Sequence, residues 1–258
     1  MTTLGIIPAR KESERFPGKH HALLLGKSMF AYTLEAALEA KRLDRLVVSS
    51  DDLELKPLAE HYGVEFIQRP KELSSVTSPL EEALRHACGL LAERDGFQPD
   101  LVVTMQGNVP VRKAGQIDEL IERLERMRSA TAMCTAQVLR VRPEWAKVIV
   151  DERTGEVAPF LLGHTGYRAQ DYPTLYAMDG AIYGVRHAVL MALQGRPSTL
   201  HAWFGERLHV LVQDHPMYSL EVDYPDQVPL AVSYLLYQRY GERWCEQFMG
   251  VPVAEAHP

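Results

Sequence analysis

The chain has 258 residues, of which 46% are hydrophobic and 24% are charged, as in a soluble globular protein built as one large domain. Its net charge of −6 argues against a nucleic-acid partner, and no apolar run approaches the roughly 18 residues that span a bilayer, so we expect no membrane partner. The three cysteines lie far apart in sequence, which argues against a disulfide framework or a cysteine zinc site and leads us to expect a cytoplasmic location.

The first half of the chain alternates between strand and helix patterns. Residues 3–8 form a short, wholly apolar run, which is typical of a parallel strand buried on both faces, and a helix pattern follows over residues 28–41. Three further units repeat this order, with strands expected at 46–48, 64–67 and 101–105 and helices at 53–61, 77–93 and 113–126. Four such units predict an α/β fold with a mostly parallel, doubly wound, Rossmann-like sheet.

The pattern changes after residue 130. Residues 142–178 are rich in Pro, Gly, Tyr and charged residues and have no clear period. Because a structureless loop of this length is unusual in a compact domain, we interpret them as an inserted dimerisation arm that packs on the second subunit of a homodimer, with a hairpin lying on its own subunit as the alternative. The remaining elements are expected to be strands at 130–141, 181–185, 208–212 and 217–222 and helices at 187–194 and 225–240.

We expect a single domain over residues 1–250, followed by a flexible tail at 251–258. In a parallel α/β sheet, ligands bind beyond the carboxyl ends of the strands. The segments that follow the first four strands should therefore meet in one crevice, although they are distant in sequence. These segments are Arg10–Lys19, Ser49–Asp52, the residues from Arg69 onward, and Gln106–Arg112.

The loop after the first strand carries three cations within ten residues, Arg10, Arg15 and Lys19. A nucleoside triphosphate carries about four negative charges, which backbone N–H groups and a few cations neutralise. The loop lacks the G-x-x-x-x-G-K-[ST] pattern of P-loop proteins and the G-x-G-x-x-G pattern of dinucleotide-binding folds. It is therefore interpreted as a polyphosphate site outside those two classes, with a solvated charged loop as the alternative.

Residues 7–19 follow the pattern I-P-A-R-x-x-S-x-R-x-P-G-K. This closely resembles the opening signature of the acidic-sugar cytidylyltransferases, the family of the CMP-sialic acid synthetases and their pseudaminic, legionaminic and Kdo relatives. The resemblance extends over residues 5–235 apart from the arm, and Glu221–Asp226 is similar to the family's terminal motif D-[IV]-D-T-P-E-D. The other matching segments are Val47–Asp52, Arg69–Leu73, Met105–Arg112 and Asp179–Tyr183.

Among the departures from the family pattern, four bear on the expected site. His20 stands where Asn is usual, and it is the one histidine that we place in the pocket. Val76 stands about where many members carry Asp. Asn108 replaces the Asp of Kdo-type members, and Glu221 replaces an Asp.

The resemblance implies that the protein transfers CMP from CTP to an acidic, ulosonic-type sugar, with release of pyrophosphate and with Mg²⁺ as cofactor. Asp223 would be catalytic and would share the metal with Glu221, since alternation along a strand puts both side chains on one face. The sugar would contact Gln106, Arg112 and Tyr183. The nucleotide-binding residues would be Pro8, Ala9, Arg10, Ser13, Arg15, Lys19 and Asn108, of which Arg10 and Lys19 would also be catalytic.

Two other functions fit the same sequence. A related enzyme would use another nucleotide, such as GTP, or another small acid as acceptor, and the mixed character of Met105–Arg112 together with His20 favours this alternative. A non-catalytic homologue would bind a nucleotide or a sugar without turnover, and Asn108, Val76 and Glu221 are the departures that point to it.

Overall fold

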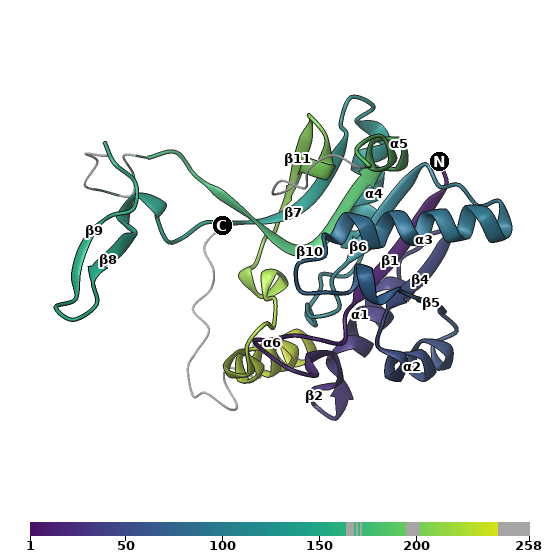
Figure 1. The fold of residues 1–258 in the computed structure, drawn as a ribbon, viewed down its shortest axis with the longest axis horizontal. Helices are drawn as coiled ribbons and strands as arrows, with labels where there is room; N and C mark the ends of the chain where they lie inside the picture. The colour runs from purple at the N-terminus through teal and green to yellow at the C-terminus, as the bar shows by residue number, and fades with distance from the viewer. Residues whose placement is uncertain (164–167, 169, 171, 195–201, 242–258) are drawn as a thin grey trace.

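The computed structural model of the protein describes residues 1–163, 168, 170, 172–194 and 202–241. A seven-stranded sheet forms its centre, in the order β11-β7-β10-β6-β1-β4-β5 (Figure 1). The strands are β1 (Thr3–Ala9), β4 (Arg45–Ser50), β5 (Glu65–Gln68), β6 (Leu101–Met105), β7 (Ala132–Val138), β10 (Tyr176–Arg186) and β11 (Leu208–Val212). The helices are α1 (Met29–Leu38), α2 (Lys56–His61), α3 (Leu80–Asp95), α4 (Gln116–Arg126), α5 (His187–Ala192) and α6 (Val228–Tyr240).

The sheet is mostly parallel, as the strand–helix alternation predicted. β4 and β6 run parallel on either side of β1, β5 runs parallel to β4, and β11 runs parallel to β7. β10 is the exception, because it lies antiparallel between β6 and β7. Its residue Ile182 pairs with Met105 at the carboxyl end of β6. The residues just before Ile182 therefore lie beside the loops that follow the parallel strands.

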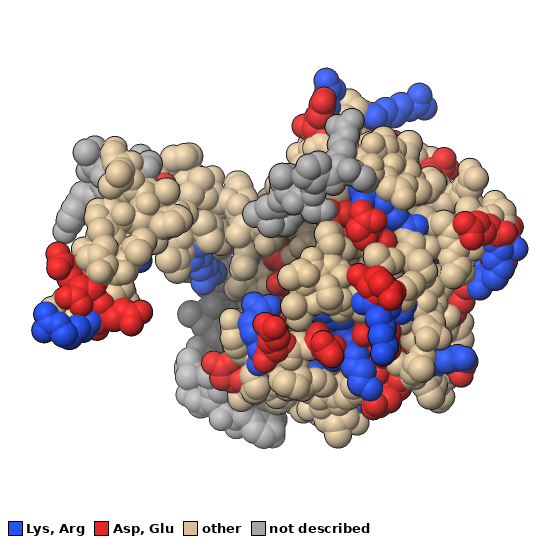
Figure 2. All heavy atoms as spheres, in the orientation of Figure 1, with Lys and Arg blue, Asp and Glu red and all other residues tan. Residues whose placement is uncertain are grey.

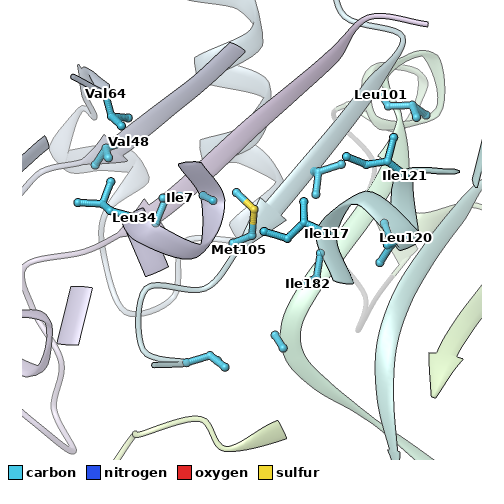
Figure 3. Packing of buried hydrophobic residues seen from close by; sticks show 14 of the residues in the cluster. Ile7, Leu34, Val48, Val64, Leu101, Met105, Ile117, Leu120, Ile121 and Ile182 are labelled. Atoms are coloured by element: carbon cyan, nitrogen blue, oxygen red, sulfur yellow. The ribbon is translucent and has the colours of Figure 1, made fainter. Parts of the chain in front are cut away.

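Helices cover both faces of the sheet, which explains why its strands are apolar throughout. Side chains alternate between the faces, so Ile6 and Ile7 are both fully buried but belong to different core clusters. Residues of α1, α2 and α4 pack on one face, and residues of α3 and α5 pack on the other. Figure 3 shows the first cluster, where Leu34 and Ile117 approach the sheet from α1 and α4. Within the described ranges, every helix is too short or too polar to serve as a membrane span.

A strand over residues 217–222 was expected, and this prediction is wrong. The segment begins as a 3-10 helix, η7 (Pro216–Ser219), and the residues after it pair with no strand of the central sheet. Proline at the first position favours a helical turn, and the side chain of His215 accepts a hydrogen bond from the N–H of Met217 at 3.1 Å. Met217 and Val222 are buried against α6 instead. The apolar pattern of the segment therefore reflects packing on a helix.

The segment between β7 and β10 forms the hairpin of β8 (Lys147–Asp151) and β9 (Glu156–Pro159). We call this hairpin the arm. Figure 1 shows the arm well clear of the sheet, and in Figure 2 its charged side chains gather at the tip. The cross-strand partners Ile149 and Val157 are 60% and 50% exposed. Among the described residues, the arm therefore leaves apolar side chains exposed and stands apart from the central sheet.

Arg112 is a structural residue in this fold. Its side chain is buried, and its two Nη atoms donate to the backbone carbonyls of Ala181 at 2.5 Å and Gln106 at 2.6 Å. It thus joins the end of β6 to β10. Burial lowers the pKa of the guanidinium to about 10, although Asp179 and Glu221 act in the opposite direction. The buried Arg112 thus stabilises the backbone below the crevice by bonding two carbonyls.

We predict that Arg112→Met lowers the free energy of unfolding by about 2–4 kcal/mol, because two buried carbonyls lose their donors. Urea unfolding monitored by circular dichroism measures this change. The matched control is Arg128→Met at an exposed position, for which we expect a change within about 0.5 kcal/mol. Equal stability of the two variants would contradict the structural role of Arg112.

Candidate active site

A tight turn directs the N-terminal loop back toward the sheet. Gly18 has a φ of 68°, a left-handed conformation that glycine adopts without strain, and the short 3-10 helix η1 (Lys19–His21) follows it. The ring of His20 then packs edge-to-face on Phe30, with the ring centroids 5.6 Å apart. The small antiparallel pair β2 (Leu23–Leu24) and β3 (Lys27–Ser28) leads the chain into α1. The loop is therefore anchored at both ends, and its cations lie above the carboxyl end of β1.

A cleft of about 250 Å³ opens at this edge of the sheet. Four distant parts of the chain line it: the end of β1 with its loop, the segment after β5, the turn after β6, and the residues before η8 (Pro225–Gln227). Nine of the predicted site residues lie in its wall, namely Pro8, Ala9, Arg10, Arg15, Lys19, Gln106, Asn108, Glu221 and Asp223. His20 also lines the cleft, where the sequence placed it.

Asp223 is the centre of the site. Its Oδ1 accepts hydrogen bonds from Lys19 Nζ at 2.8 Å and Asn108 Nδ2 at 2.9 Å, and its Oδ2 accepts one from Arg15 Nη2 at 2.5 Å. Burial acts to raise the pKa of Asp223, but the hydrogen bond and charge of Lys19 and the charge of Arg15 outweigh it, so the pKa lies below its ordinary value. The ionised carboxylate of Asp223 thus binds the N-terminal loop, although Asp223 and Lys19 are 204 positions apart in sequence.

Backbone contacts fix the segment that carries Asp223. The N–H of Val222 donates to the carbonyl of Asn108 at 2.8 Å. The side-chain Oε1 of Gln227 accepts the N–H of Asp223 at 2.7 Å and that of Tyr224 at 2.9 Å. Glu221 and Asp223 both line the cleft, while Val222 between them is buried on the side of α6, so the side chains alternate although the segment pairs with no strand of the central sheet.

The carboxyl of Glu221 lies directly over Gly180. A Cβ on Gly180, whose φ is 69°, would lie 1.5 Å from Glu221 Oε1, so the position leaves no room for a side chain. Burial raises the pKa of Glu221 to about 7, and the charge of Asp223 adds to this effect. No Lys or Arg in the part of the chain that the structure describes forms an ion pair with Glu221. Among the described residues, the Glu221 carboxylate therefore has no direct cationic partner.

Arg10 and Arg69 also line the cleft. Arg10 Nη1 donates to the carbonyls of Val76 at 3.2 Å and Ser75 at 3.4 Å, which ties the N-terminal loop to the segment before α3. Arg69 is 6% exposed and donates to the carbonyl of Ser49 at 2.5 Å. Its pKa is lowered to about 10, mainly by burial. Val76, where the family often has Asp, thus contributes its carbonyl to Arg10.

His20 is a neutral group in this wall. Burial lowers its pKa to about 3, with a further contribution from the neighbouring charge of Lys19. A Cβ on Gly107 would come within 3.1 Å of His20 Cδ2 and within 2.8 Å of Phe30, so the imidazole fits closely against the turn after β6. His20 therefore offers hydrogen bonding to the cleft without adding charge.

Three predicted contact residues do not line the cleft. Arg112 is buried below it, where its donors are used by backbone carbonyls. Tyr183 is 9% exposed and packs against Trp203 and Phe204, because its register opposite Thr104 of β6 puts it on the sheet face covered by α3 and α5. Ser13 lies in the N-terminal loop outside the lining. These three side chains thus lie outside the cleft wall, while the other nine predicted residues form part of it.

The cleft also contains residues that the sequence reasoning did not assign. Ser75 and Ser78 line it and hydrogen-bond each other at 2.7 Å, and Leu80 at the start of α3 lies beside them. The available signal was the run Ser74-Ser75-Val76-Thr77-Ser78-Pro79, which follows a strand and is rich in hydroxyls. The segment Ser49–Asp52, which was expected in the same crevice, does not line the cleft. Its residue Asp52 instead caps the next turn by accepting the N–H of Glu54 at 3.1 Å.

Among the described residues, His21, Asp52 and Glu54 form one group with potential metal-ligand atoms close together. His21 Nε2 lies 2.7 Å from Asp52 Oδ2, and Lys11 Nζ lies 3.2 Å from Glu54 Oε1. These contacts and the cap of Asp52 account for the group as an ion-pair network outside the cleft.

Comparison with known proteins decides the family. Residues 4–200 match the family model described as Cytidylyltransferase. The chain belongs to this cytidylyltransferase family. It is 38% identical over 125 residues to a 3-deoxy-manno-octulosonate cytidylyltransferase of Syntrophobacter fumaroxidans, a match that covers 48% of the chain and 47% of that relative, about half its length. An 8-amino-3,8-dideoxy-manno-octulosonate cytidylyltransferase of a Shewanella species is 29% identical, over 88% of this chain and 96% of the relative.

The fold of this cytidylyltransferase-family chain is also known from solved structures. The structure of CMP:2-keto-3-deoxy-manno-octonic acid synthetase complexed with CTP superimposes with a TM-score of 0.67, covering 93% of this chain and all of that chain. The identity between the two is 19%, so the likeness concerns the fold. It agrees with the α/β sheet predicted from the sequence.

The donor atoms of this family member fit a magnesium ion. Mg²⁺ prefers oxygen ligands in octahedral geometry, keeps several waters and needs only one or two carboxylates. Glu221 and Asp223 supply two carboxylates to one cleft, and the Asn108 side chain adds an amide beside them. These residues would hold the ion.

We predict that Glu221 makes the ligand-free protein less stable as the pH rises. Its pKa of about 7, against an ordinary 4.5, means that the folded state binds the proton more tightly than the unfolded chain does. The resulting stabilisation is complete below pH 4.5 and is lost as the pH rises through 7. Between pH 5 and pH 8, the free energy of unfolding should therefore fall less for Glu221→Gln than for wild type, and the difference should reach up to about 3 kcal/mol.

Urea unfolding at a series of pH values, in buffer with a metal chelator, measures this difference. The control is Glu12→Gln, an exposed substitution in the N-terminal loop, which should follow the wild-type curve. Parallel curves for wild type and Glu221→Gln would mean that Glu221 titrates normally.

Proposed function

We propose that the protein is a Mg²⁺-dependent cytidylyltransferase that transfers CMP from CTP to an acidic sugar of the ulosonic type. The observation that carries the proposal is the meeting of Lys19 and Arg15 with Asp223 in one cleft. Cations suited to a triphosphate and carboxylates suited to its metal ion lie side by side there. Membership of the cytidylyltransferase family supports the reaction class. The relatives named above act on octulosonates, which supports an acidic eight-carbon sugar as acceptor.

The reaction would need charge neutralisation and positioning more than covalent help. A hydroxyl oxygen of the sugar attacks the α-phosphorus and loses its proton, while the bond from that phosphorus to the bridging oxygen breaks and pyrophosphate leaves. Arg15 and Lys19 would exchange their bonds with Asp223 for bonds with the phosphates. Glu221 and Asp223 would hold Mg²⁺, which when bound neutralises phosphate charge and lowers the pKa of a coordinated hydroxyl.

Arg10 would contribute through position as well as charge. Its bonds to the carbonyls of Ser75 and Val76 hold the hydroxyl-rich segment over the cleft. Gln106 and Asn108 face the cleft from the turn after β6 and would contact the substrates. A cytoplasmic location is part of the proposal, and the buried free thiols of Cys88 and Cys134 agree with a reducing compartment.

Purified protein should be assayed with Mg²⁺, each of the four nucleoside triphosphates and a panel of ulosonic acids, with pyrophosphate release as the readout. We expect release with CTP and an octulosonate or nonulosonate. Release with GTP and not with CTP would overturn the choice of nucleotide. Nucleotide binding without release for any pair would favour a non-catalytic homologue.

We predict that Lys19→Ala and Asp223→Asn each lower turnover at least ~100-fold, because an oriented charge contact of this kind contributes roughly 3 kcal/mol. Steady-state pyrophosphate release measures the loss, and circular dichroism checks the fold. The matched control is Lys11→Ala, a cation of the same loop that pairs with Glu54 outside the cleft. Wild-type turnover in Lys19→Ala or Asp223→Asn would refute the proposed roles.

We also propose that the arm packs on a second copy of this chain. Its apolar surface includes Ile149 and Val157, which lie opposite each other in the hairpin. An isolated two-stranded hairpin is marginally stable in water, so a partner surface would stabilise it. A single-subunit function would leave this apolar surface facing solvent.

The variant Ile149→Lys/Val157→Glu replaces the apolar pair with opposite charges that still attract across the hairpin. We predict that wild type sediments as a dimer and that this variant sediments as a monomer at micromolar concentration. Arg153→Glu at the charged tip is the control and should remain dimeric. A monomeric wild type would contradict the proposal.

A further inference from the structure

Tyr224 contacts a cation of the cleft from outside its wall. The guanidinium carbon of Arg15 lies 5.2 Å from the centroid of the Tyr224 ring. The pKa of Arg15 is raised by its contact with Tyr224 and, after that, by the charge of Asp223. Tyr224 itself is 46% exposed and is absent from the lining of the cleft. Its contact with the site is therefore made through Arg15.

Arg15 depends on such a support more than Lys19 does. The Arg15 side chain is 52% exposed, against 12% for the side chain of Lys19. Arg15 also lies in a stretch without helix or strand, before the turn at Gly18. A long cation on a loop loses considerable side-chain entropy when it is fixed on a ligand. A residue that already restricts the arginine side chain reduces the entropy that is lost when the ligand binds.

The backbone of Tyr224 is well placed to give this support. Its N–H donates to Gln227 Oε1 at 2.9 Å, and Pro225 after it favours the extended conformation that it adopts. The same Gln227 oxygen holds the N–H of Asp223 at 2.7 Å. One turn thus fixes both partners of Arg15, the carboxylate and the aromatic ring.

The two contacts leave Arg15 able to change partners. An aromatic ring binds the face of a guanidinium, whereas carboxylates and phosphates bind its N–H edge. A phosphate oxygen that replaces Asp223 Oδ2 would take the same edge and leave the ring contact in place. Arg15 would then turn from the carboxylate to the phosphate without leaving Tyr224.

From this arrangement we infer that Tyr224 is a positioning residue, which holds Arg15 at the rim of the cleft for the phosphate groups of the incoming nucleotide. The family motif that this segment resembles has Thr at the same position, and Thr has no ring to stack. The inference rests on the proposed function, because it requires a nucleoside triphosphate as ligand.

The test is a double-mutant cycle on the dissociation constant for CTP, measured by calorimetry with Mg²⁺ for wild type, Tyr224→Thr, Arg15→Gln and the double variant. We expect Tyr224→Thr to weaken CTP binding about two- to fivefold in the chain that has Arg15, the range of an exposed cation–π contact. In the Arg15→Gln background the same substitution should change the constant less than about 1.5-fold. Full additivity in the two backgrounds would overturn the inference.

Two further variants separate positioning from a general structural effect. Tyr224→Phe keeps the ring, so its constant should lie between those of wild type and Tyr224→Thr, and a value no better than that of Tyr224→Thr would overturn the role of the ring. The matched control is Tyr240→Thr, because Tyr240 is 50% exposed and stacks on Arg239 at 5.6 Å, away from the cleft. It should bind CTP as wild type does.

The same data distinguish the two levels of the proposal. If wild type binds no nucleoside triphosphate, the proposed function fails. If wild type binds CTP and Tyr224→Thr binds it equally well, the proposed function stands and the role of Tyr224 fails. Steady-state kinetics adds a second readout, since Tyr224→Thr should raise the KM for CTP more than it lowers kcat.

Discussion

The ion pairs at Asp223 are the constraint on which the site depends. They join a loop near the N-terminus to a turn near the end of the described chain, across 204 residues. The parallel sheet makes this possible, because the carboxyl ends of its strands lie at one edge. The buried segment around Met217 and Val222 then brings the turn to that edge from the side of α6. Without the carboxylate, Arg15 and Lys19 would repel each other in a half-buried wall.

Most of the fold and half of the site follow from local patterns. The apolar runs and helix periods of the first half gave the parallel sheet, and the sheet places Lys19 beside the turn after β6 whatever the residues between them are. The family resemblance then named the carboxylates that belong with the loop. Both arguments depend on residue types at fixed spacing, which a single sequence displays.

The places where the structure differs from the sequence-based expectations have a common physical origin. Arg112 has the charge of a ligand-binding residue, but its partners are the backbone carbonyls of Gln106 and Ala181, which no sequence pattern displays. Tyr183 faces the core because its register opposite Thr104 puts it on the sheet face covered by α3 and α5. The apolar run 217–222 packs on a helix and not in the sheet. In each case the partner is set by tertiary structure.

The closeness of Glu221 to Gly180 links two positions that belong to different motifs. The longer acid fills the space where a side chain at position 180 would begin. A shorter Asp at 221 would withdraw its oxygens by one methylene and free that space. A residue larger than glycine at 180 therefore requires a shorter acid at 221, and the left-handed φ of 69° limits that residue to asparagine, which tolerates the conformation. In related sequences, a residue larger than glycine at 180 should occur only with an acid shorter than glutamate at 221.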